Sequence, residues 1–497
     1  MSLLLPAPDG FARLENLIDG KRCPALSLER LASVDPSIGE TWAEIPSSGS
    51  DDIAAAVDAA KRAFSGAWSD LPALGRAGLL RNLAGLFADH ASELARIESR
   101  DNGRALAETS AGDLPAVTQI LHYFAGAADK LMGDTVQVSP ASFNFTVVEA
   151  VGVVGIIIPW NAPLSILAAK VGAALAAGCT VVVKPAEQAS CSILAAAELF
   201  EHAGFPPGVV NIVSGLGSTA GDSLVRHPDV RKISFTGSTA TARRITAASA
   251  DSLTQLAFEL GGKSANIVFA DADLDAAELG VSTASVFTGG AGQTCVAGSR
   301  ILIERPIYEE MVERIARRAS EVRIGDPMDL ETQMGPIAFD RQYDKVRDYI
   351  ALGSQEGAEI AFGGRSGEAL MGAGSPHAGG YFVEPTFFRD ARNDMRICRE
   401  EIFGPVASAI PFDTEEEAVA LANDSSYGLA CGVWTSDLKR AHRAIAAVKT
   451  GVVWVNAYRR IHWALPFGGV KESGYGRDSG LESLRGYLHT KTAWIEL

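Results

Sequence analysis

The sequence lacks the clusters of basic residues that mark nucleic-acid-binding proteins. Its 497 residues include 60 acidic and 44 basic side chains, which gives a formal net charge of −16. Lys and Arg stand at most two in a row, as at Arg243 and Arg244 or at Arg459 and Arg460. A surface that follows a phosphate backbone needs basic side chains grouped together, so no nucleic-acid partner is expected.

Long hydrophobic runs and paired cysteines are missing as well. The longest apolar stretches, 151–159 and 171–183, are too short for a bilayer span of about 20 residues, so no membrane partner is expected. The six cysteines form no CxxC pair, which excludes a disulfide framework or a metal site and favours a reducing compartment. Because the first basic residue is Arg13, the N-terminus lacks the charged start of a signal peptide, and a cytoplasmic location is predicted.

Short apolar strands alternate with helices along the chain from residue 151 onward. Strands are predicted at 153–158, 180–184, 209–213, 232–235 and 256–260, and helices at 163–177 and 191–202. Buried strands that alternate with helices of this length are typical of an α/β fold with a doubly wound parallel sheet. Ligands of such a sheet bind beyond the carboxyl ends of its strands. The turns that follow these strands are therefore the first candidates for a binding site.

The rest of the chain divides into helical, α/β and projecting parts. Residues 51–133 are predicted to be helical. A second α/β series is predicted over 266–460, with strands at 266–270, 300–304 and near Glu359 and Tyr381, and helices at 307–322 and 341–352. Residues 143–149 and 487–497 alternate enough to be strands, and together they are expected to form a small projecting sheet used for assembly.

Three polar or glycine-rich turns are candidates for a phosphate or sugar site. Residues 215–221 have the spacing GxGxxxG rather than the dinucleotide fingerprint GxGxxG, which favours an ordinary loop. The turn Phe235-Thr-Gly-Ser-Thr239 leads from a strand into a helix, where the first amides hold a pyrophosphate or form a plain N-cap. Lys184 and Glu187 share one turn after a strand, where both are placed to bond ribose hydroxyls.

Two residues have the character of reacting groups. Cys295 lies in Gly-Gly-Ala-Gly-Gln-Thr-Cys-Val-Ala-Gly-Ser-Arg, residues 289–300. Most cysteines are small buried hydrophobes, but flexible backbone on both sides leaves this thiol approachable, as a nucleophile requires. Glu259 ends a buried apolar strand. Acids are rarely buried without a task or a partner, so a general base and a structural ion pair are both open.

Seven motifs occur in a fixed order over more than 300 residues. They are Ile158-Pro-Trp-Asn161, Lys184-Pro-Ala-Glu187, Phe235-Thr-Gly-Ser-Thr239, Glu259-Leu-Gly-Gly-Lys263, Gly292-Gln-Thr-Cys295, Glu401-Ile-Phe-Gly-Pro405 and Pro466-Phe-Gly-Gly-Val-Lys-Glu-Ser-Gly474. With this ordered set the sequence resembles the NAD(P)-dependent aldehyde dehydrogenase superfamily, essentially from end to end.

The resemblance implies a mechanism with a role for each of four residues. Cys295 would attack the aldehyde carbon, and the Asn161 amide with the Cys295 backbone N–H would stabilise the oxyanion. Hydride transfer would leave a thioacyl enzyme, and Glu259 would activate the water that hydrolyses it. Lys170 matches a lysine that the family places near the proton path, although a lysine on a helix is usually solvated.

The cofactor that the resemblance implies is NAD. Lys184 and Glu187 would bond the adenosine ribose, and the Glu187 carboxylate would repel the extra phosphate of NADP, which leaves NADP as the alternative. The candidate cofactor-binding residues are Ile158, Trp160, Lys184, Glu187, Gly217, Gly237, Ser238, Leu260, Glu401 and Phe403.

Departures from the family pattern bear on the substrate. Many relatives carry aromatic residues where this chain has Ala127, Ala162 and Ala169, so a wider substrate tunnel is expected. A bulky or aromatic aldehyde is predicted, with any acidic group on it meeting Arg459, unless Arg459 is solvated or contacts another subunit. The candidate tunnel residues are Ala162, Ala169, Val296, Arg459 and Trp463. His489 replaces a Glu of many relatives, which puts a carboxylate relay there in doubt.

The resemblance also implies a division of the chain and a homodimer or homotetramer. The expected parts are a Rossmann-like NAD-binding domain (1–131 and 151–261), a catalytic α/β domain (262–465) and an oligomerisation element (132–150 and 478–497). Two other functions stay open. A coenzyme A-acylating or phosphorylating semialdehyde dehydrogenase is opposed by the water-activating Glu259, and a non-catalytic binding protein is opposed by the presence of Cys295, Glu259 and Asn161 together.

Overall fold

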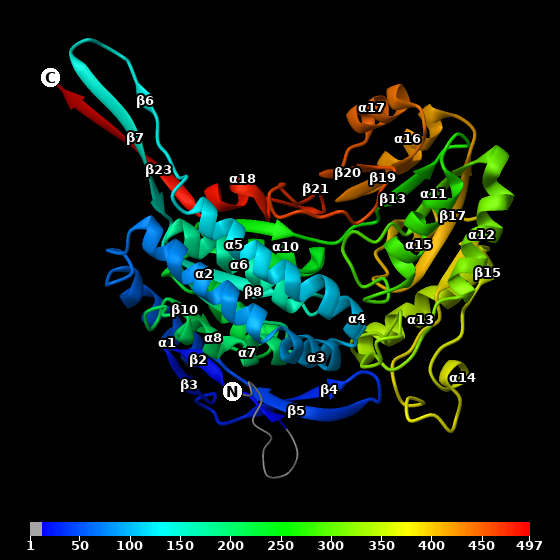
Figure 1. The fold of residues 1–497 in the computed structure, drawn as a ribbon, viewed down its shortest axis with the longest axis horizontal. Coiled ribbons are helices and arrows are strands. Elements are labelled where there is room, and N and C mark those ends of the chain that lie inside the picture. Colours follow the sequence, from blue (N-terminus) through cyan, green and yellow to red (C-terminus); the bar gives the residue numbers. More distant parts are fainter. Residues whose placement is uncertain (1–11) are drawn as a thin grey trace.

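Two large sheets organise the chain, and a smaller sheet projects beside one of them (Figure 1). The computed structural model describes residues 12–497. Residues 1–11, which include most of the segment used to judge the N-terminus, lie outside the described residues. The mixed α/β class expected from the sequence is confirmed.

The first large sheet contains the doubly wound parallel core that the alternating pattern predicted. Its parallel strands are, in spatial order, β12 (Gln255–Glu259), β11 (Val230–Thr236), β8 (Val153–Ile158), β9 (Thr180–Pro185) and β10 (Val210–Ile212). The chain runs outward from β8 to β10 and then returns to β11 on the other side of β8. This reversal creates a switch point between β8 and β11, which is where open parallel sheets bind ligands.

Antiparallel strands at both edges of this sheet were not predicted. Strands β2 (Asn16–Ile18) and β3 (Lys21–Cys23) extend the β10 edge, and β22 (Gly474–Tyr475) pairs with β12 at the other edge. A separate sheet holds β1 (Ala12–Arg13), β5 (Glu40–Pro46) and β4 (Arg30–Asp35). Strands as short as β2, β3 and β22 pair with distant segments or across a tight turn, so local alternation does not reveal them.

The helices of the first lobe, which is built around this sheet, follow the predicted pattern with one interruption. Helix α6 (Pro163–Ala177) has Pro at its first position and ends at Gly178, whose φ of +96° forms a left-handed cap. The predicted helix over 191–202 is divided at Ala196, because its ψ of −8° departs from the helical value. The other helices here are α1 (Ser50–Phe64), α2 (Ala73–Asp89), α3 (Ala91–Asn102), α4 (Leu106–Glu108), α5 (Leu114–Ala127), α7 (Cys191–Ala195), α8 (Ala197–His202), α9 (Asp222–Arg226), α10 (Thr239–Ala248) and α18 (Gly480–Arg485).

The second large sheet has seven strands in the order β15-β16-β17-β14-β13-β19-β20. The strand expected near Tyr381 begins only at Thr386, because Pro385 has no N–H for a ladder, and the Tyr381 amide instead donates to the Pro36 carbonyl. The strands are β13 (Ala265–Val268), β14 (Arg300–Glu304), β15 (Glu359–Phe362), β16 (Thr386–Arg389), β17 (Val406–Phe412), β19 (Ala430–Trp434) and β20 (Val452–Val455). The longer helices of this lobe are α11 (Leu274–Val281), α12 (Tyr308–Ser320), α13 (Asp340–Gln355), α16 (Glu415–Asn423) and α17 (Leu438–Ala447). No helix within residues 12–497 combines the length and apolar character that a membrane crossing requires.

The projecting sheet joins the two segments that were expected to pair. Strand β7 (Ser142–Ala150) lies antiparallel to β23 (Leu488–Glu496), and β6 (Thr135–Val136) completes the sheet (Figure 1). The two longer strands are paired along their whole length, from Leu488 opposite Ala150 to Glu496 opposite Ser142.

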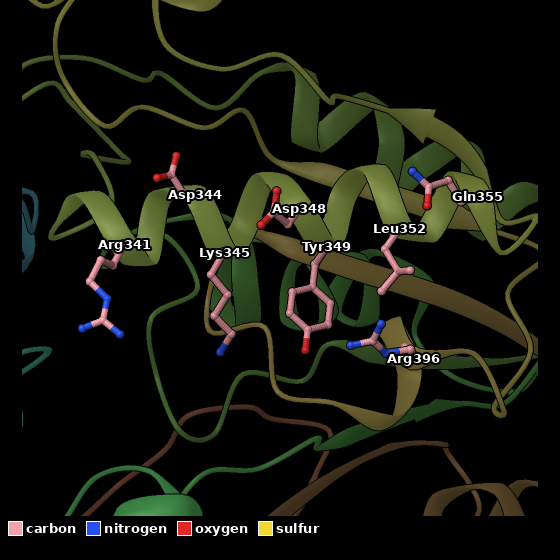
Figure 2. A pocket seen from close by; sticks show the side chains of 8 residues that line it. All are labelled: Arg341, Asp344, Lys345, Asp348, Tyr349, Leu352, Gln355 and Arg396. Carbon is pink, nitrogen blue, oxygen red and sulfur yellow. The ribbon is translucent and has the colours of Figure 1, made fainter.

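An open depression runs along one side of α13 in the second lobe. Figure 2 shows Lys345, Tyr349 and Leu352 pointing to the side of the helix on which Arg396 lies, while Asp344 and Asp348 point away. The lining mixes both signs of charge, and Arg396 already pairs with Glu400 at 2.9 Å. This depression therefore lacks the convergent polar groups of a ligand site.

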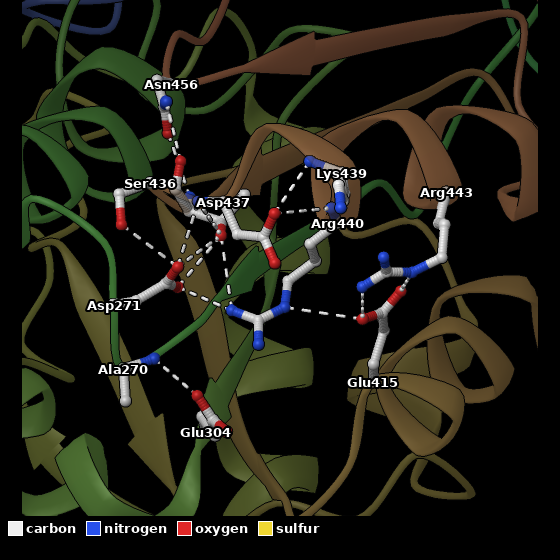
Figure 3. Close-up of polar contacts among 11 residues, drawn as sticks. Ala270, Asp271, Glu304, Glu415, Ser436, Asp437, Lys439, Arg440, Arg443 and Asn456 are labelled. Carbon is white, nitrogen blue, oxygen red and sulfur yellow. Dashed lines mark hydrogen bonds and ion pairs between the residues drawn. The ribbon is translucent and has the colours of Figure 1, made fainter.

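A polar network ties the end of β13 to α17. Asp271 accepts hydrogen bonds from the Thr435 hydroxyl at 2.9 Å and from the Asp437 amide at 3.1 Å (Figure 3). Its carboxylate also lies 2.7 Å from Arg440 Nη1, and the Arg440 guanidinium stacks 4.4 Å from the centre of the Phe269 ring. One carboxylate thus joins two segments, 269–271 and 435–440, that are far apart in the sequence.

We expect Asp271→Ala to lower the free energy of unfolding by about 2 kcal/mol, because it leaves a hydroxyl, an amide and the Arg440 guanidinium without their acceptor. The measurement is the urea midpoint followed by circular dichroism. Asp413→Ala removes an exposed pair with Arg305 and serves as the control, with an unchanged midpoint. Equal midpoints for both variants would contradict the role given to Asp271.

Candidate active site

A cleft of about 660 Å³, counting the part open to solvent, lies at the switch point between β8 and β11. One wall comes from the turns that follow β8, β11 and β12, and the other from the Cys295 loop, α13 and the segment 401–403 of the second lobe. The lining residues are Pro159, Trp160, Asn161, Ile166, Thr236, Gly237, Ser238, Glu259, Leu260, Gly261, Cys295, Gln342, Lys345, Glu401 and Phe403. Many candidates that the sequence placed on separate motifs therefore share one cleft.

The turn after β8 places Asn161 against the Cys295 loop. Its side-chain Nδ2 donates a hydrogen bond to the Gln293 carbonyl, 3.0 Å away. Its backbone carbonyl accepts a hydrogen bond of 2.9 Å from Arg104 Nη1. Because a side-chain amide has two N–H groups, Asn161 keeps a second donor for the cleft that it shares with Cys295.

Glycines let the backbone of the Cys295 loop pack closely against its neighbours. A Cβ atom on Gly292, whose φ is +68°, would lie 2.2 Å from the Gly404 carbonyl oxygen. A Cβ on Gly262 would lie 2.7 Å from the carbonyl oxygen of Cys295. These distances are too short for any larger residue, so glycine is required at both positions.

The Cys295 thiol is protonated near neutral pH. Burial, helped by the negative charges of Glu259 and Glu401, raises its pKa to about 12. Only the thiolate is a good nucleophile. A base must therefore take the proton before this sulfur can attack.

Glu259 is a buried carboxylate without a hydrogen-bonding partner. Its side chain lies at the end of β12 and is 6% exposed, and among residues 12–497 neither oxygen has a partner. A Cβ on Gly468 would lie 2.3 Å from Oε1, so glycine there makes room for the carboxylate. Burial and the nearby charge of Asp478 raise the pKa of Glu259 well above its usual value. A structural ion pair would have a partner within reach, so this arrangement favours a general base.

Lys170 is buried and paired, not solvated as lysines on helices usually are. It is 1% exposed, and its Nζ lies 2.9 Å from Asp478 Oδ2 and 2.9 Å from Ser234 Oγ. Sequence reasoning missed Asp478, since nothing in its local pattern separates it from a surface aspartate. Asp478 and Lys170 act in opposite directions on the pKa of Glu259.

Aromatic rings and a second carboxylate form the far end of the cleft. The Trp160 ring meets Phe403 edge to face, with ring centres 5.2 Å apart. The Glu401 carboxylate accepts a hydrogen bond of 2.9 Å from the Gly262 amide, and burial raises its pKa. Two residues that sequence reasoning missed hold this segment. Gln342 donates to the Phe403 carbonyl at 2.9 Å and Lys345 to that of Glu401 at 2.8 Å.

The turns after β9 and β11 have groups that suit a sugar and its phosphates. Lys184 Nζ lies 2.8 Å from Glu187 Oε2, and burial lowers the pKa of Lys184. Ser238 caps the N-terminus of α10, where its Oγ accepts a hydrogen bond from the Thr241 amide. A hydroxyl at a helix N-terminus and a buried ammonium beside a carboxylate fit a nucleotide with a ribose diol and phosphates.

Several predicted residues do not line this cleft. The residues absent from its walls are Ile158, Lys184, Glu187, Ala162, Ala169 and Val296. Gly217 is exposed at the start of the short helix Gly217–Gly221. Ala127, Ala169 and Trp463 pack on the hydrophobic core of the first lobe.

The expected contact between Arg459 and an acidic substrate stays a prediction. Arg459 Nη2 lies 3.0 Å from Glu108 Oε1, so the guanidinium already has one carboxylate partner within the protein. His489 lies on the projecting sheet and pairs with Glu149 at 3.1 Å. It is exposed there and is not among the residues that line the cleft.

No group of three or more His, Cys, Asp or Glu side chains within residues 12–497 is arranged to hold a metal ion. All six cysteines are unpaired.

Comparison with known proteins identifies an aldehyde dehydrogenase over nearly the whole chain. The aldehyde dehydrogenase family model matches residues 24–493. The hydroxyisobutyraldehyde dehydrogenase of Mycolicibacterium austroafricanum is 44% identical over 482 residues, which cover 97% of this chain and 93% of that protein. The NAD+ complex of the Bacillus cereus aldehyde dehydrogenase is 42% identical with a TM-score of 0.94 and covers 99% of both chains. The Staphylococcus aureus betaine aldehyde dehydrogenase in complex with NAD+ is 36% identical, also with a TM-score of 0.94, over 97% of this chain and 94% of that chain.

The cleft, its thiol, its unpartnered carboxylate and these similarities lead to one conclusion: the chain belongs to the aldehyde dehydrogenase family.

Proposed function

We propose that this enzyme oxidises an aldehyde to the carboxylate with NAD, through a covalent intermediate on Cys295. The observation that carries the proposal is the buried, unpartnered Glu259 carboxylate in the same cleft as the Cys295 thiol. Two relatives of known structure were solved with NAD+, which supports NAD as the cofactor of this chain.

The first step is attack by the Cys295 sulfur. Glu259 in its deprotonated form accepts the thiol proton, and the sulfur bonds the aldehyde carbon while the carbonyl electron pair moves onto oxygen. The second N–H of the Asn161 side chain and the Cys295 backbone amide stabilise this oxyanion. Such preorganised donors are worth about 10²- to 10³-fold in kcat each.

NAD supplies the acceptor for the hydride that leaves this carbon. Lys184 and Glu187 would hold the adenosine ribose, Ser238 the phosphates and Glu401 the nicotinamide ribose. The remaining candidates for cofactor contact are Ile158, Trp160, Gly217, Gly237, Leu260 and Phe403. A negative charge at Glu187 disfavours a phosphate on the 2′-oxygen, so NAD is preferred over NADP.

Hydrolysis of the thioester completes the reaction. Glu259 first releases the proton that it took from the thiol and then takes a proton from water. The water oxygen bonds the acyl carbon, and the carbon–sulfur bond breaks to release the carboxylate product and the Cys295 thiolate. The proton on Glu259 then passes toward Asp478 and Lys170, which lie 2.9 Å apart in the interior. A coenzyme A acceptor would not need this base.

Cys295→Ser and Glu259→Gln test the two halves of the reaction. We expect Cys295→Ser to abolish NADH formation. Glu259→Gln should form NADH only as a slow burst of at most about one equivalent, because the thiol and the hydrolytic water both lose their base, and should accumulate the thioacyl enzyme. Stopped-flow absorbance and intact-mass spectrometry provide the two measurements. Unchanged turnover of Cys295→Ser, or a product that requires coenzyme A, would contradict the proposal.

The pH profile tests the electrostatic setting of Glu259. Because the pKa of Glu259 is raised and only its deprotonated form is a base, kcat should rise with pH through that pKa. Asp478→Asn removes a neighbouring negative charge and should move the acid limb about one unit to lower pH, while Lys170→Met should move it to higher pH. Asp229→Asn, at an exposed pair with Lys61, should leave the profile in place. Shifts of Asp478→Asn and Lys170→Met in the same direction would exclude this explanation.

We propose a bulky or aromatic aldehyde as the substrate. Ile166 of α6 lines the cleft. Ala162, at the N-cap of α6, and Ala169 lie four residues before and three residues after Ile166, on the same side of the helix, and both are only partly buried. Small residues along this side leave room beyond the reacting carbon.

Ala169→Phe should therefore lower kcat/KM for an aromatic aldehyde by about tenfold or more and change that for acetaldehyde little. Steady-state assays with both aldehydes give the two values, and acetaldehyde serves as the internal control. Equal kcat/KM for both aldehydes in the unaltered enzyme would count against the substrate class.

We also propose a cytoplasmic homodimer or homotetramer in which the projecting sheet makes subunit contacts. Large apolar side chains, including Phe143, Trp494 and Ile495, are exposed on this sheet, and exposed apolar surface of this kind marks an interface.

A further inference from the structure

A buried arginine lies behind the turn that carries Asn161. The Arg104 side chain is 7% exposed, and its Nη1 donates a hydrogen bond of 2.9 Å to the Asn161 carbonyl. Its Nη2 lies 3.1 Å from Glu108 Oε1 and 2.7 Å from Asp113 Oδ2. The guanidinium is thus held by two carboxylates, and it directs one N–H group at the backbone of the catalytic asparagine.

Asn102 supports the preceding residue of the same turn. Its Nδ2 donates to the Trp160 carbonyl at 3.2 Å, and its Oδ1 accepts from the Arg104 amide at 3.1 Å. Gly103 separates the two residues with a φ of +78°, and a Cβ there would lie 2.8 Å from Pro336. The segment 102–104 therefore has little freedom, and it holds two consecutive carbonyls of the Asn161 turn.

The same cluster reaches the other loops of the cleft. Glu108 also lies 3.0 Å from Arg459 Nη2, in the loop that precedes the motif at Pro466. A Cβ on Gly289, at the start of the approach to Cys295, would lie 1.9 Å from Glu108 Oε2. Arg104 and Glu108 thus connect three chain segments that must keep their relative places during the reaction.

Asn161 needs such support because one of its two donors is already committed to the Gln293 carbonyl. The other must point at the oxygen of the substrate, and a displacement of about 1 Å costs on the order of 100-fold in rate. Because the Asn161 carbonyl is held by a hydrogen bond, the backbone that carries the Asn161 side chain is fixed, and so is the direction of its amide.

We propose that Arg104, together with Asn102, is a positioning residue that aims the Asn161 amide at the oxyanion. This inference rests on the proposed function. Neither residue lines the cleft, and their effect on the reaction passes through Asn161.

A double-mutant cycle tests this role. Arg104→Lys keeps a positive charge between the carboxylates but loses the guanidinium, which can bond the carboxylates and the Asn161 carbonyl together. Asn102→Ala leaves the buried charges intact. Each change is made in the unaltered enzyme and in Asn161→Ala, and kcat is measured from NADH formation. The matched control is Arg76→Lys, since Arg76 also bonds backbone carbonyls, those of Leu71 and of Ala176 at the other end of α6.

We expect Arg104→Lys to lower kcat about tenfold or more in the unaltered enzyme and less than about twofold in Asn161→Ala. Arg76→Lys should have little effect in either. Asn102→Ala should show the same dependence on Asn161, and it decides the question where Arg104→Lys does not fold. An equal fold-loss in both backgrounds, or an unchanged kcat in folded Arg104→Lys, would overturn the role. Absence of NADH formation by the unaltered enzyme with every aldehyde would overturn the proposed function and this inference with it.

Discussion

The structure of the site depends on keeping one carboxylate dry and without a partner. Removing an unpaired carboxylate from water costs several kcal/mol, and the few contacts of a surface loop do not offset that free energy. Glu259 is therefore placed at the end of β12, which is paired on both sides, between two lobes that each have their own core. The raised pKa of Glu259 is the direct result, and it makes this residue a stronger base than an exposed carboxylate.

Close backbone packing is what brings the two lobes together at this carboxylate. The Cys295 loop approaches Gly262, and the segment at Gly468 approaches Glu259, so closely that a single methyl group on either glycine would collide. The pKa of both reacting groups in the cleft rises for the same reason, burial.

Much of the fold and the centre of the site could be predicted from the sequence, because they depend on local patterns. The parallel core and α6 follow from alternation and from Pro163 and Gly178, and Cys295, Glu259 and Asn161 lie in motifs. The pairing of Lys170 with Asp478 and the occupation of Arg459 by Glu108 could not be predicted. Both join residues more than 300 positions apart, and only the folded chain decides which charges meet. The short edge strands were missed for the same reason, since their partners are distant.

The net charge of the chain does not predict the charges that surround its binding cleft. Among residues 12–497, six basic and seven acidic side chains are buried, so the interior is close to neutral and the excess of negative charge lies outside. Surface charge is screened within about 8–10 Å at physiological ionic strength. Buried charges are screened far less, and the ammonium of Lys184 and the guanidinium of Arg104 belong to that group. On the proposed assignment, an anionic cofactor would be held by Lys184 and by Ser238 at a helix N-terminus, and the negatively charged surface would not prevent its binding.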